Sequence, residues 1–284
     1  EHVLDEYPRP LMVRDSYLNL NGYWDYAFTQ EFVCPKEFDG KILVPFSPEA
    51  ALSGVNRQLM PDEYLWYHRT FSVDGHKTKR ADESFSEEDP ESGMGADLTE
   101  ERLLLHFGAV DQACVVWVNG QRIGKHTGGY LPFEFEITEA VQAGENDLVV
   151  AVKDLSDTSY HSRGKQKLER GGMFYTAQSG IWQTVWLEQV DSAHFTSVHF
   201  IPSLDSVEVF VQTSESGSVC MEVLEEDSCI TAHTFTAGGS QTVSFEAPRL
   251  WTPEQPFLYR VRLSLLRAGR ETDRVESYFG LRTF

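Results

Sequence analysis

Residues 115–126 read VVWVNGQRIGKH, and this stretch predicts a β-hairpin. Val115 to Val118 form a run of residues that favour strands, and Gln121 to Ile123 continue the chain on the far side of Asn119-Gly120. Asn-Gly is the pair that best tolerates positive φ at both central positions of a type I′ turn. Because such turns occur in antiparallel sheets of every kind, the hairpin by itself predicts structure and not function.

Short segments of β-forming residues recur along the first two thirds of the chain, between clusters of Gly, Pro, Asn and Asp. Helical periodicity is almost absent from the same region. The segments lie at residues 41–46, 64–73, 102–108, 113–120, 147–154 and 181–190. This pattern predicts an all-β protein.

The strand pattern changes after Val190. From His194 onward about seven short, evenly spaced segments occur within about ninety residues, which is typical of an immunoglobulin-like sandwich. The Cys…Trp…Cys pattern of antibody domains is missing. A chain of 284 residues is also long enough for two cores. We therefore expect two domains, residues 1–191 and 192–284, with the boundary near residues 190–193.

The chain is strongly acidic, with 24 Lys and Arg against 44 Asp and Glu and a formal charge of −20. Such a charge repels phosphate backbones and anionic membranes, so we expect neither nucleic acid nor a membrane as a partner. Residues 74–101 hold ten of the acidic residues against three basic ones. A segment of that composition buries too little apolar surface to order itself. It predicts an exposed, mobile insertion between two strands, in preference to a functional acidic tail.

The four cysteines, Cys34, Cys114, Cys220 and Cys229, show no metal-binding or redox spacing. We interpret them as reduced thiols, with a Cys220–Cys229 disulfide as the alternative. The first residues, EHVLDEYPRP, are charged where a secretory signal would be apolar, and no apolar run approaches the length of a membrane span. The expected location is cytoplasmic; a signal peptide trimmed from the chain is the alternative.

Several familiar motifs are incomplete in this chain. Gly164-Lys165 lacks both the first glycine and the Ser or Thr of a phosphate-binding loop, because Ser159 and Gln166 stand at those positions. Gln178-Ser179-Gly180 lacks the flanking glycines of a nucleophile elbow. The nine histidines show no zinc-binding spacing. The sequence therefore gives no support to these three kinds of site.

The hairpin is one of a series of short segments that follow one another in a recognisable order along the chain. The run around it reads LLLHFGAVDQACVVWVNGQRIGKHTGGYLPFEFEIT; the other segments are residues 8–10, 20–24, 65–71, 144–148, 179–187, 250–253, 256–259 and 278–282. In this order they resemble the amino-terminal part of glycoside hydrolase family 2, the β-galactosidases and β-glucuronidases. The resemblance covers nearly the whole chain except residues 74–101.

The resemblance implies a jelly-roll, galactose-binding-like β-sandwich for residues 1–191 and an immunoglobulin-like β-sandwich for residues 192–284. In the family a (β/α)₈ barrel follows and carries the acid/base and nucleophile glutamates of a retaining glycosidase. This chain stops where that barrel would begin. We therefore expect a truncated chain that has no catalytic residues and is inactive alone, from a parent enzyme that hydrolyses terminal β-linked sugars. The alternatives are a freestanding carbohydrate-binding module without hydrolytic activity and an adhesion module.

Three residues are candidates for sugar contact through the resemblance. Asp157, in Ser156-Asp157-Thr158-Ser159-Tyr160, matches an aspartate that reaches the active site in the β-galactosidase branch. Its carboxylate could accept sugar hydroxyls or share a monovalent cation, and the alternative is an aspartate that only caps its loop. Asp62 falls where the branch places a polar asparagine, and Arg163 lies on the polar loop after Asp157.

The resemblance also implies partners and cofactors. The partners are the carboxy-terminal catalytic barrel of the same chain, a carbohydrate substrate, and other copies in a dimer or tetramer. No cofactor is required by this chain, and Na⁺ or Mg²⁺ is expected in the parent enzyme. Trp117 and Val115 are expected to pack in the jelly-roll core. Four further aromatic residues are interpreted as packing groups: Trp66, Tyr130, Phe174 and Trp182.

Overall fold

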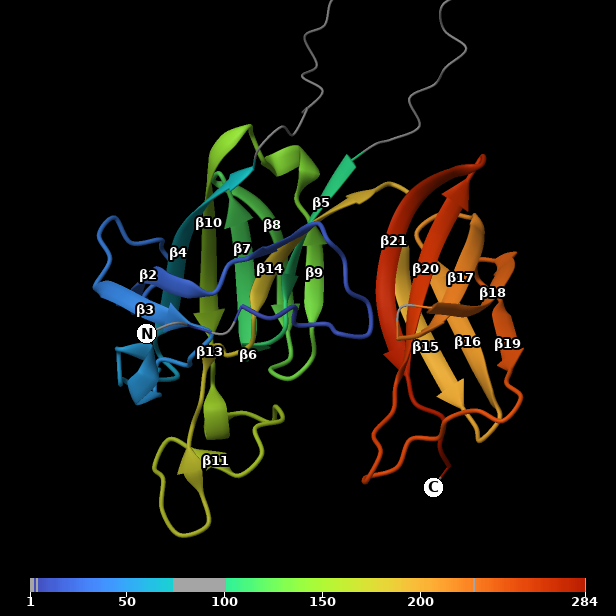
Figure 1. Cartoon of the computed structure of the whole chain (residues 1–284). Helices are drawn as coiled ribbons and strands as arrows, with labels where there is room; N and C mark the ends of the chain where they lie inside the picture. Colours follow the sequence, from blue (N-terminus) through green and yellow to red (C-terminus); the bar gives the residue numbers. More distant parts are fainter. Residues whose placement is uncertain (1–2, 4, 74–100, 227, 284) are drawn as a thin grey trace, which may run out of the picture. The chain divides into compact units, whose positions relative to one another are not determined.

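The computed structural model describes residues 3, 5–73, 101–226 and 228–283, which form two compact units (Figure 1). Unit 1 comprises mainly residues 17–73 and 103–188. Unit 2 comprises Tyr7–Ser16, residues 101–102 and the described residues from Gln189 onward. The predicted acidic insertion at 74–101 lies outside the described residues except for Glu101. The domain boundary predicted at residues 191 and 192 stays a prediction.

Unit 1 is a sandwich of two β-sheets with strand orders β3-β2-β4-β10-β7-β8 and β1-β14-β5-β9. The strands of the first sheet, in that order, are Gly40–Val44, Gly22–Thr29, Tyr64–Val73, Gly144–Lys153, Ala113–Val118 and Gln121–Thr127. Those of the second sheet are Tyr17–Asn19, Val185–Asp191, Glu101–Phe107 and Phe133–Glu136.

Short elements complete unit 1 at the ends of these sheets. Two small strand pairs are β6 (Val110–Asp111) with β13 (Gly180–Ile181), and β11 (Gln166–Lys167) with β12 (Tyr175–Thr176). The described helices are single turns of 3₁₀ type: η1 (Ala51–Ser53), η2 (Thr138–Ala140) and η3 (Ser156–Thr158). No helix within the described ranges is long and apolar enough to cross a membrane.

The predicted hairpin is present as β7 and β8. Val118 pairs with Gln121, so the loop contains only Asn119 and Gly120. Both loop residues have positive φ, 50° and 77°, as a type I′ turn requires. Asn119 also donates its side-chain amide to Asn146 Oδ1 at 2.7 Å. The turn therefore has a second role, because it ties the hairpin to the start of β10.

The prediction that Val115 and Trp117 face the core is wrong. Alternate residues of β7 are buried, and they are Cys114, Val116 and Val118. Trp117 lies on the opposite face, where its ring stacks on Trp66 with centroids 5.7 Å apart. A run that is apolar at every position offers both faces to a core, so alternation within the run could not select one.

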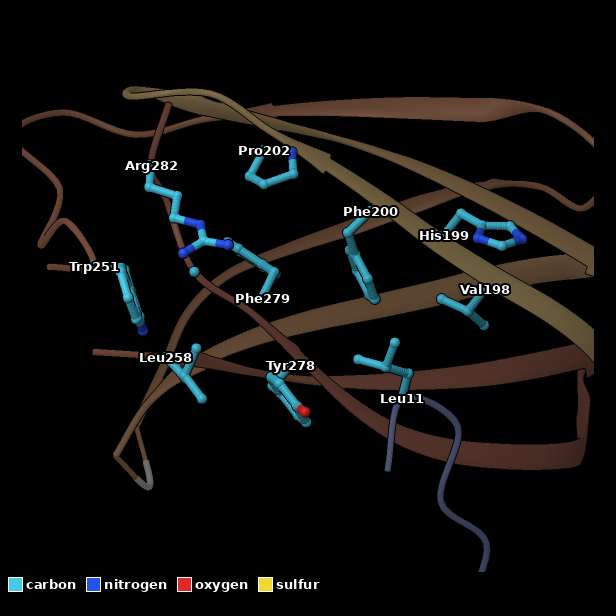
Figure 2. A pocket seen from close by; sticks show the side chains of 11 residues that line it. Leu11, Val198, His199, Phe200, Pro202, Trp251, Leu258, Tyr278, Phe279 and Arg282 are labelled. Atoms are coloured by element: carbon cyan, nitrogen blue, oxygen red, sulfur yellow. The ribbon is translucent and has the colours of Figure 1, made fainter. Parts of the chain in front are cut away.

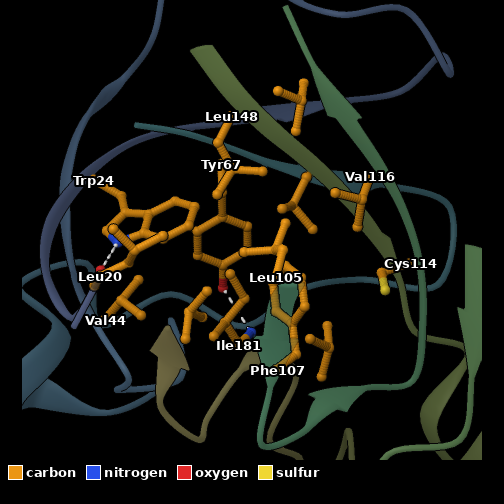
Figure 3. Packing of buried hydrophobic residues seen from close by; sticks show 14 of the residues in the cluster. Leu20, Trp24, Val44, Tyr67, Leu105, Phe107, Cys114, Val116, Leu148 and Ile181 are labelled. Atoms are coloured by element: carbon orange, nitrogen blue, oxygen red, sulfur yellow. Dashed lines mark hydrogen bonds between the residues drawn. The ribbon is translucent and has the colours of Figure 1, made fainter. Parts of the chain in front are cut away.

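The core of unit 1 lies between its two sheets and contains large side chains with satisfied polar atoms (Figure 3). Trp24 donates its indole N–H to the Leu20 carbonyl at 2.8 Å. The Tyr67 hydroxyl accepts the Ile181 N–H at 3.2 Å, and burial raises the pKa of this tyrosine. Because buried polar groups without partners are costly, these two bonds allow large amphipathic rings to fill the core.

Unit 2 is a second β-sandwich, and all seven of its predicted strand segments are confirmed. One sheet contains β15 (Phe195–Pro202), β16 (Ser206–Thr213) and β19 (Ser240–Ser244). The other contains β18 (Ser228–Thr236), β17 (Ser218–Glu225), β20 (Tyr259–Arg267) and β21 (Arg270–Phe279). Together the two units confirm the predicted all-β class.

The segment Tyr7–Ser16 packs within unit 2, although it precedes unit 1 in sequence. Val13 forms a β-bridge with Glu276 of β21. Arg14 makes a buried salt bridge to Asp273 at 2.8 Å and donates to the Phe195 carbonyl at 2.6 Å. A buried ion pair of this kind fixes geometry more than it adds stability, because desolvation offsets much of the attraction.

The four cysteines are free thiols in the structure. Cys220 is opposite Thr234 in the β17–β18 ladder, whereas Cys229 is opposite Leu224. The alternative of a Cys220–Cys229 disulfide is therefore not realised, and the interpretation as thiols agrees with the structure.

Candidate functional site

The polar loop that carries Asp157 leaves β10 and returns at β13; Figure 1 shows it around the β11 label. Its two limbs pair as parallel strands, Gln166 with Tyr175 and Lys167 with Thr176. Gln166 Oε1 accepts the backbone N–H of Gln178 at 2.7 Å. The Lys167 ammonium lies 4.0 Å from the centre of the Phe174 ring. These contacts give an exposed loop a defined conformation.

Asp157 lies in the single turn η3 at the start of this loop and is partly exposed. Its Oδ1 accepts the backbone N–H of Leu168 at 3.0 Å. This hydrogen bond lowers the pKa of Asp157, and the positive charges of Arg163 and Lys167 act in the same direction. The carboxylate is therefore ionised at neutral pH and held in one place, as a hydroxyl acceptor requires.

Arg163 and Asp62, the other two residues predicted to contact sugar, lie in different surroundings. Arg163 donates to the Ser159 carbonyl at 3.2 Å on the same loop as Asp157. Asp62 is exposed in the turn before β4, where its charge acts on Lys153. Lys153 in turn donates to the Glu63 carbonyl at 3.0 Å. The structure thus brings Asp157 and Arg163 together, whereas Asp62 interacts with the end of β10.

A half-buried carboxylate that the sequence did not reveal lies beside the base of the loop. Glu49 Oε1 accepts the Ser179 hydroxyl at 2.5 Å, and Oε2 accepts the Ser179 N–H at 3.1 Å. Glu49 also accepts the Leu59 N–H at 3.1 Å. Burial raises the pKa of Glu49, and the hydrogen bonds oppose that rise. Glu49 thereby joins the segment at residues 49–59 to Ser179, which lies 130 residues further along the chain.

Asp111 and Asp154 are two buried carboxylates near Glu49, each 6% exposed. Asp154 Oδ1 accepts the Ser156 N–H at 2.7 Å, and burial raises its pKa. Burial, followed by the negative charges of Asp154 and Glu49, raises the pKa of Asp111 to about 7. A carboxyl group with such a pKa is partly protonated at neutral pH and can donate as well as accept a hydrogen bond.

Two aromatic side chains border these carboxylates. Trp182 donates its indole N–H to the Gly129 carbonyl at 2.8 Å, and Tyr130 meets its ring edge-on with centroids 6.1 Å apart. Tyr130 is 45% exposed, and its pKa is raised by burial and then by the charges of Asp111 and Asp154. A Cβ on Gly129 would overlap the Asp111 carboxylate, so only glycine fits there.

Two further polar atoms in this region lack a partner among the described residues. They are Gln112 Oε1 and Ser156 Oγ, on side chains that are each 5% exposed. Aromatic rings beside hydroxyl acceptors are the groups with which proteins bind sugars, since rings cover the apolar face of a pyranose.

The sequence did not identify Asp111, Asp154 and Glu49 as candidate site residues. The only signal was that Asp111 and Asp154 stand at strand ends.

The other aromatic candidates are packing groups, as predicted. Trp66 is 2% exposed, is covered by Phe32 at 5.5 Å between ring centres and donates to Thr29 Oγ1 at 2.9 Å. Phe174 lies under the Lys167 ammonium. The Trp66 ring therefore offers no open face to a ligand.

The described residues contain no group of three or more His, Cys, Asp or Glu side chains arranged to hold a metal ion. The predicted monovalent cation at Asp157 would therefore need additional oxygen ligands, because hard cations take six or more oxygens. The cation stays a prediction. Asp157 by itself supplies one ionised carboxylate oxygen that is free of the Leu168 hydrogen bond.

The known proteins to which this chain is similar include β-galactosidases and β-glucuronidases. In a β-galactosidase of Thermoanaerobacter pseudethanolicus, 28% of 199 aligned residues are identical, covering 64% of this chain and 26% of that protein. A β-galactosidase of Halalkalibacterium halodurans is 27% identical over 97% of this chain and 28% of its own length. A β-glucuronidase of Paenibacillus borealis is 27% identical over 77% of this chain.

Solved structures show the same fold. The β-glucuronidase of Bifidobacterium dentium, complexed with coumarin-3-O-glucuronide, superposes with a TM-score of 0.70 at 21% identity, covering 96% of this chain and 49% of that chain. A β-glucuronidase of Ruminococcus gnavus gives a TM-score of 0.71 at 20% identity, over 98% and 48%. This chain spans about half the length of these structures and about a quarter of the two β-galactosidases.

Two family descriptions match successive parts of the chain. Residues 93–190 match the sugar-binding domain of glycosyl hydrolases family 2. Residues 193–282 match a second description, named glycosyl hydrolases family 2. Because the two matches follow one another and together account for most of the sequence, the chain belongs to glycosyl hydrolase family 2.

Proposed function

We propose that this chain is the non-catalytic amino-terminal part of a retaining β-glycosidase of the β-galactosidase type. The observation that carries the proposal is the succession of two family 2 domains in a chain that spans only part of its relatives. Relatives named β-galactosidase and β-glucuronidase support a parent that hydrolyses terminal β-linked sugars. The catalytic glutamates would lie in a barrel that follows residue 284, and the 284-residue chain alone would be inactive.

The role of this chain in the parent would be to support the barrel and to supply Asp157 to a sugar subsite. Two features of Asp157 favour that role. Its carboxylate is ionised, and the Leu168 hydrogen bond fixes its position on an exposed loop. A fixed acceptor loses little entropy when it binds a sugar hydroxyl. Arg163 adds a positive charge beside it, and Asp62 is a further candidate.

No cofactor is needed for this role. A Na⁺ or Mg²⁺ ion in the parent would share the second oxygen of Asp157 with oxygens of the barrel. The protein would act on carbohydrate in the cytoplasm, and the complete enzyme would be a homo-oligomer.

The test begins with the DNA that follows the codon for Phe284. We expect an open frame that encodes a barrel, and a product that hydrolyses p-nitrophenyl β-galactoside or β-glucuronide. Proton NMR of the first-formed anomer then checks retention, because a double displacement releases the β-anomer first. The 284-residue chain, assayed in parallel, should show no turnover. A stop codon after Phe284 or an α-anomer formed first would contradict the proposal.

A carbohydrate-binding module without hydrolytic activity is the second candidate. Tyr130 and Trp182 favour it, since they form an aromatic pair and Tyr130 lies close enough to Asp111 and Asp154 to be affected by their charges. Calorimetric titration of the 284-residue chain with galactose, glucuronate and lactose separates the two candidates. Saturable binding that Tyr130→Ala abolishes would favour the module. Heats equal to those of dilution at millimolar sugar would favour the truncated glycosidase.

A further inference from the structure

A hydrogen bond to the backbone fixes the position of Asp157 on the polar loop between β10 and β13, which is called the Asp157 loop below. Figure 2 shows a groove of about 480 Å³ in unit 2, and none of the residues of this loop line it. Asp157 is partly exposed, and its Oδ1 accepts the N–H of Leu168 at 3.0 Å. The conformation of Leu168 therefore decides where the Asp157 carboxylate lies.

Leu168 is held at its carbonyl group by a side chain from a distant segment. Gln58 donates its amide Nε2–H to the Leu168 carbonyl at 3.1 Å, and the two residues are 110 positions apart in sequence. The N–H and the C=O of Leu168 are thus both bonded, and these groups lie on either side of its two soft dihedral angles. Gln58 therefore constrains the residue that positions Asp157.

The segment that carries Gln58 is itself anchored. Arg57 donates its backbone N–H to the Pro48 carbonyl at 2.9 Å. Leu59 donates its backbone N–H to Glu49 Oε1 at 3.1 Å, and its side chain is 2% exposed in the core of unit 1. Both neighbours of Gln58 are therefore held in place. A side chain from a fixed segment positions its partner more precisely than one from a mobile loop.

The part of the loop that follows Leu168 contributes little packing. Residues 169–173 are all exposed, and they include Gly171 and Gly172 with φ of 154° and 59°. Glycine loses more conformational freedom than other residues when it becomes ordered. Arg170 donates to Thr176 Oγ1 at 2.7 Å, but both residues belong to the loop. Among the described residues, the hydrogen bond from Gln58 is the one that ties Leu168 to a segment outside the loop.

We propose that Gln58 is a positioning residue for Asp157: it holds Leu168, and Leu168 holds the carboxylate in the orientation that a sugar hydroxyl requires. This role rests on the proposed function, in which Asp157 contacts sugar. The Gln58 amide suits the role because it forms no other hydrogen bond among the described residues. A neutral amide donor also fixes the loop without adding a positive charge that would pair with the carboxylate.

NMR of the 284-residue chain tests the link between Gln58 and Asp157. Gln58 is half-buried, and Gln58→Met keeps a flexible side chain of similar length but removes the donor. Exchange of the Leu168 amide hydrogen should become about threefold to tenfold faster, as the loss of one hydrogen bond predicts. The pKa of Asp157 should rise towards its ordinary value, because the bond from Leu168 is the main cause that lowers it.

Gln142→Met is the matched control. Gln142 also donates its side-chain amide to a backbone carbonyl, that of Glu145 at 3.1 Å, outside the Asp157 loop. This variant should change neither the exchange of the Leu168 amide nor the pKa of Asp157. If Gln58→Met lowers the melting temperature but leaves both NMR readouts unchanged, Gln58 only stabilises the fold and the inference is wrong.

Steady-state kinetics of the complete enzyme tests the consequence for catalysis. Gln58→Met should lower kcat/KM by about threefold to tenfold, and Gln142→Met by less than about twofold. Asp157→Ala removes the carboxylate through which Gln58 acts. Adding Gln58→Met to Asp157→Ala should therefore cause no further loss, and fully multiplicative losses would contradict a role through Asp157.

The two readouts distinguish a failure of this inference from a failure of the proposed function. An Asp157→Ala enzyme with unchanged kcat/KM would overturn the sugar contact, and the positioning role with it. Unchanged NMR readouts in Gln58→Met, together with a large loss of kcat/KM in Asp157→Ala, would overturn the positioning role alone.

Discussion

Gly180 lies directly against the hydroxyl of Tyr67, so closely that a Cβ at this position would overlap the phenol oxygen. Gly180 also has a φ of 76°, a conformation that side chains with a Cβ adopt reluctantly. The tyrosine hydroxyl accepts the N–H of the next residue, Ile181. This contact joins strand β4 to the end of the Asp157 loop, and it requires glycine for two independent reasons.

Gly180→Ala should destabilise unit 1 by about 3 kcal/mol, since the left-handed conformation costs about 1–2 kcal/mol and displacement of Tyr67 adds to it. Gly120→Ala is the control. Gly120 has nearly the same φ, 77°, but no atom lies within 4 Å of its Cβ position. Urea denaturation gives the free energy of unfolding of both variants, and the difference between them is the cost of the overlap with Tyr67. Equal losses would show that Tyr67 moves aside without cost.

Val116→Ala should cost about 2 kcal/mol, because it removes two methyl groups from a fully buried position and leaves a cavity. Val115 is the adjacent control, on the half-buried opposite face of β7. Val115→Ala should cost less than about 1 kcal/mol. Thermal unfolding of the two variants measures which face of the hairpin carries the core. A larger loss for Val115→Ala than for Val116→Ala would show that Val115 faces the core, as the sequence suggested.

Asp111 should make stability fall as pH rises towards neutrality. Its folded pKa of about 7 lies above the ordinary value, so the protonated form is the one that the fold favours. Its contribution is complete below about pH 4 and is lost between about pH 4 and 7. Asp111→Asn removes this dependence. The variant should gain of order 3 kcal/mol relative to the natural chain between pH 4 and pH 8.

Urea denaturation at pH 4, 6 and 8 measures this difference. The charges of Asp154 and Glu49 contribute to the effect on Asp111, so the comparison uses the difference between the two proteins. Asp62→Asn, at an exposed carboxylate, serves as the control for the loss of one negative charge. A constant offset between Asp111→Asn and the natural chain would show that folding does not raise the pKa of Asp111.

Asp157→Asn in the complete enzyme should lower kcat/KM by about tenfold or more, because a charged hydrogen bond to sugar contributes about 1.5–3 kcal/mol. Asparagine can still accept the Leu168 N–H, so the loop should keep its conformation. Glu169→Gln on the same exposed loop is the control and should change kcat/KM by less than about twofold. Steady-state kinetics of the two variants distinguishes a sugar contact by Asp157 from a role in capping its loop. Equal effects would assign Asp157 to capping its loop.

Much of the fold could be predicted because its signals are local. The seven segments after His194 became seven strands, and Asn119-Gly120 became the predicted type I′ turn. Chance resemblance was also unlikely to produce so many segments in one order, which is why the family could be predicted. Asp157 and Arg163 were found together because they share one loop.

The strands, the turns and the family could be predicted from the amino-acid sequence, since strand propensity and Asn-Gly turns depend on neighbouring residues. The buried face of β7 and the proximity of Glu49, Asp111 and Asp154 could be seen in the three-dimensional structure alone. These carboxylates come from segments about sixty and forty residues apart in sequence. Burial and Coulomb interactions depend on distance in space, which no local pattern of residues records.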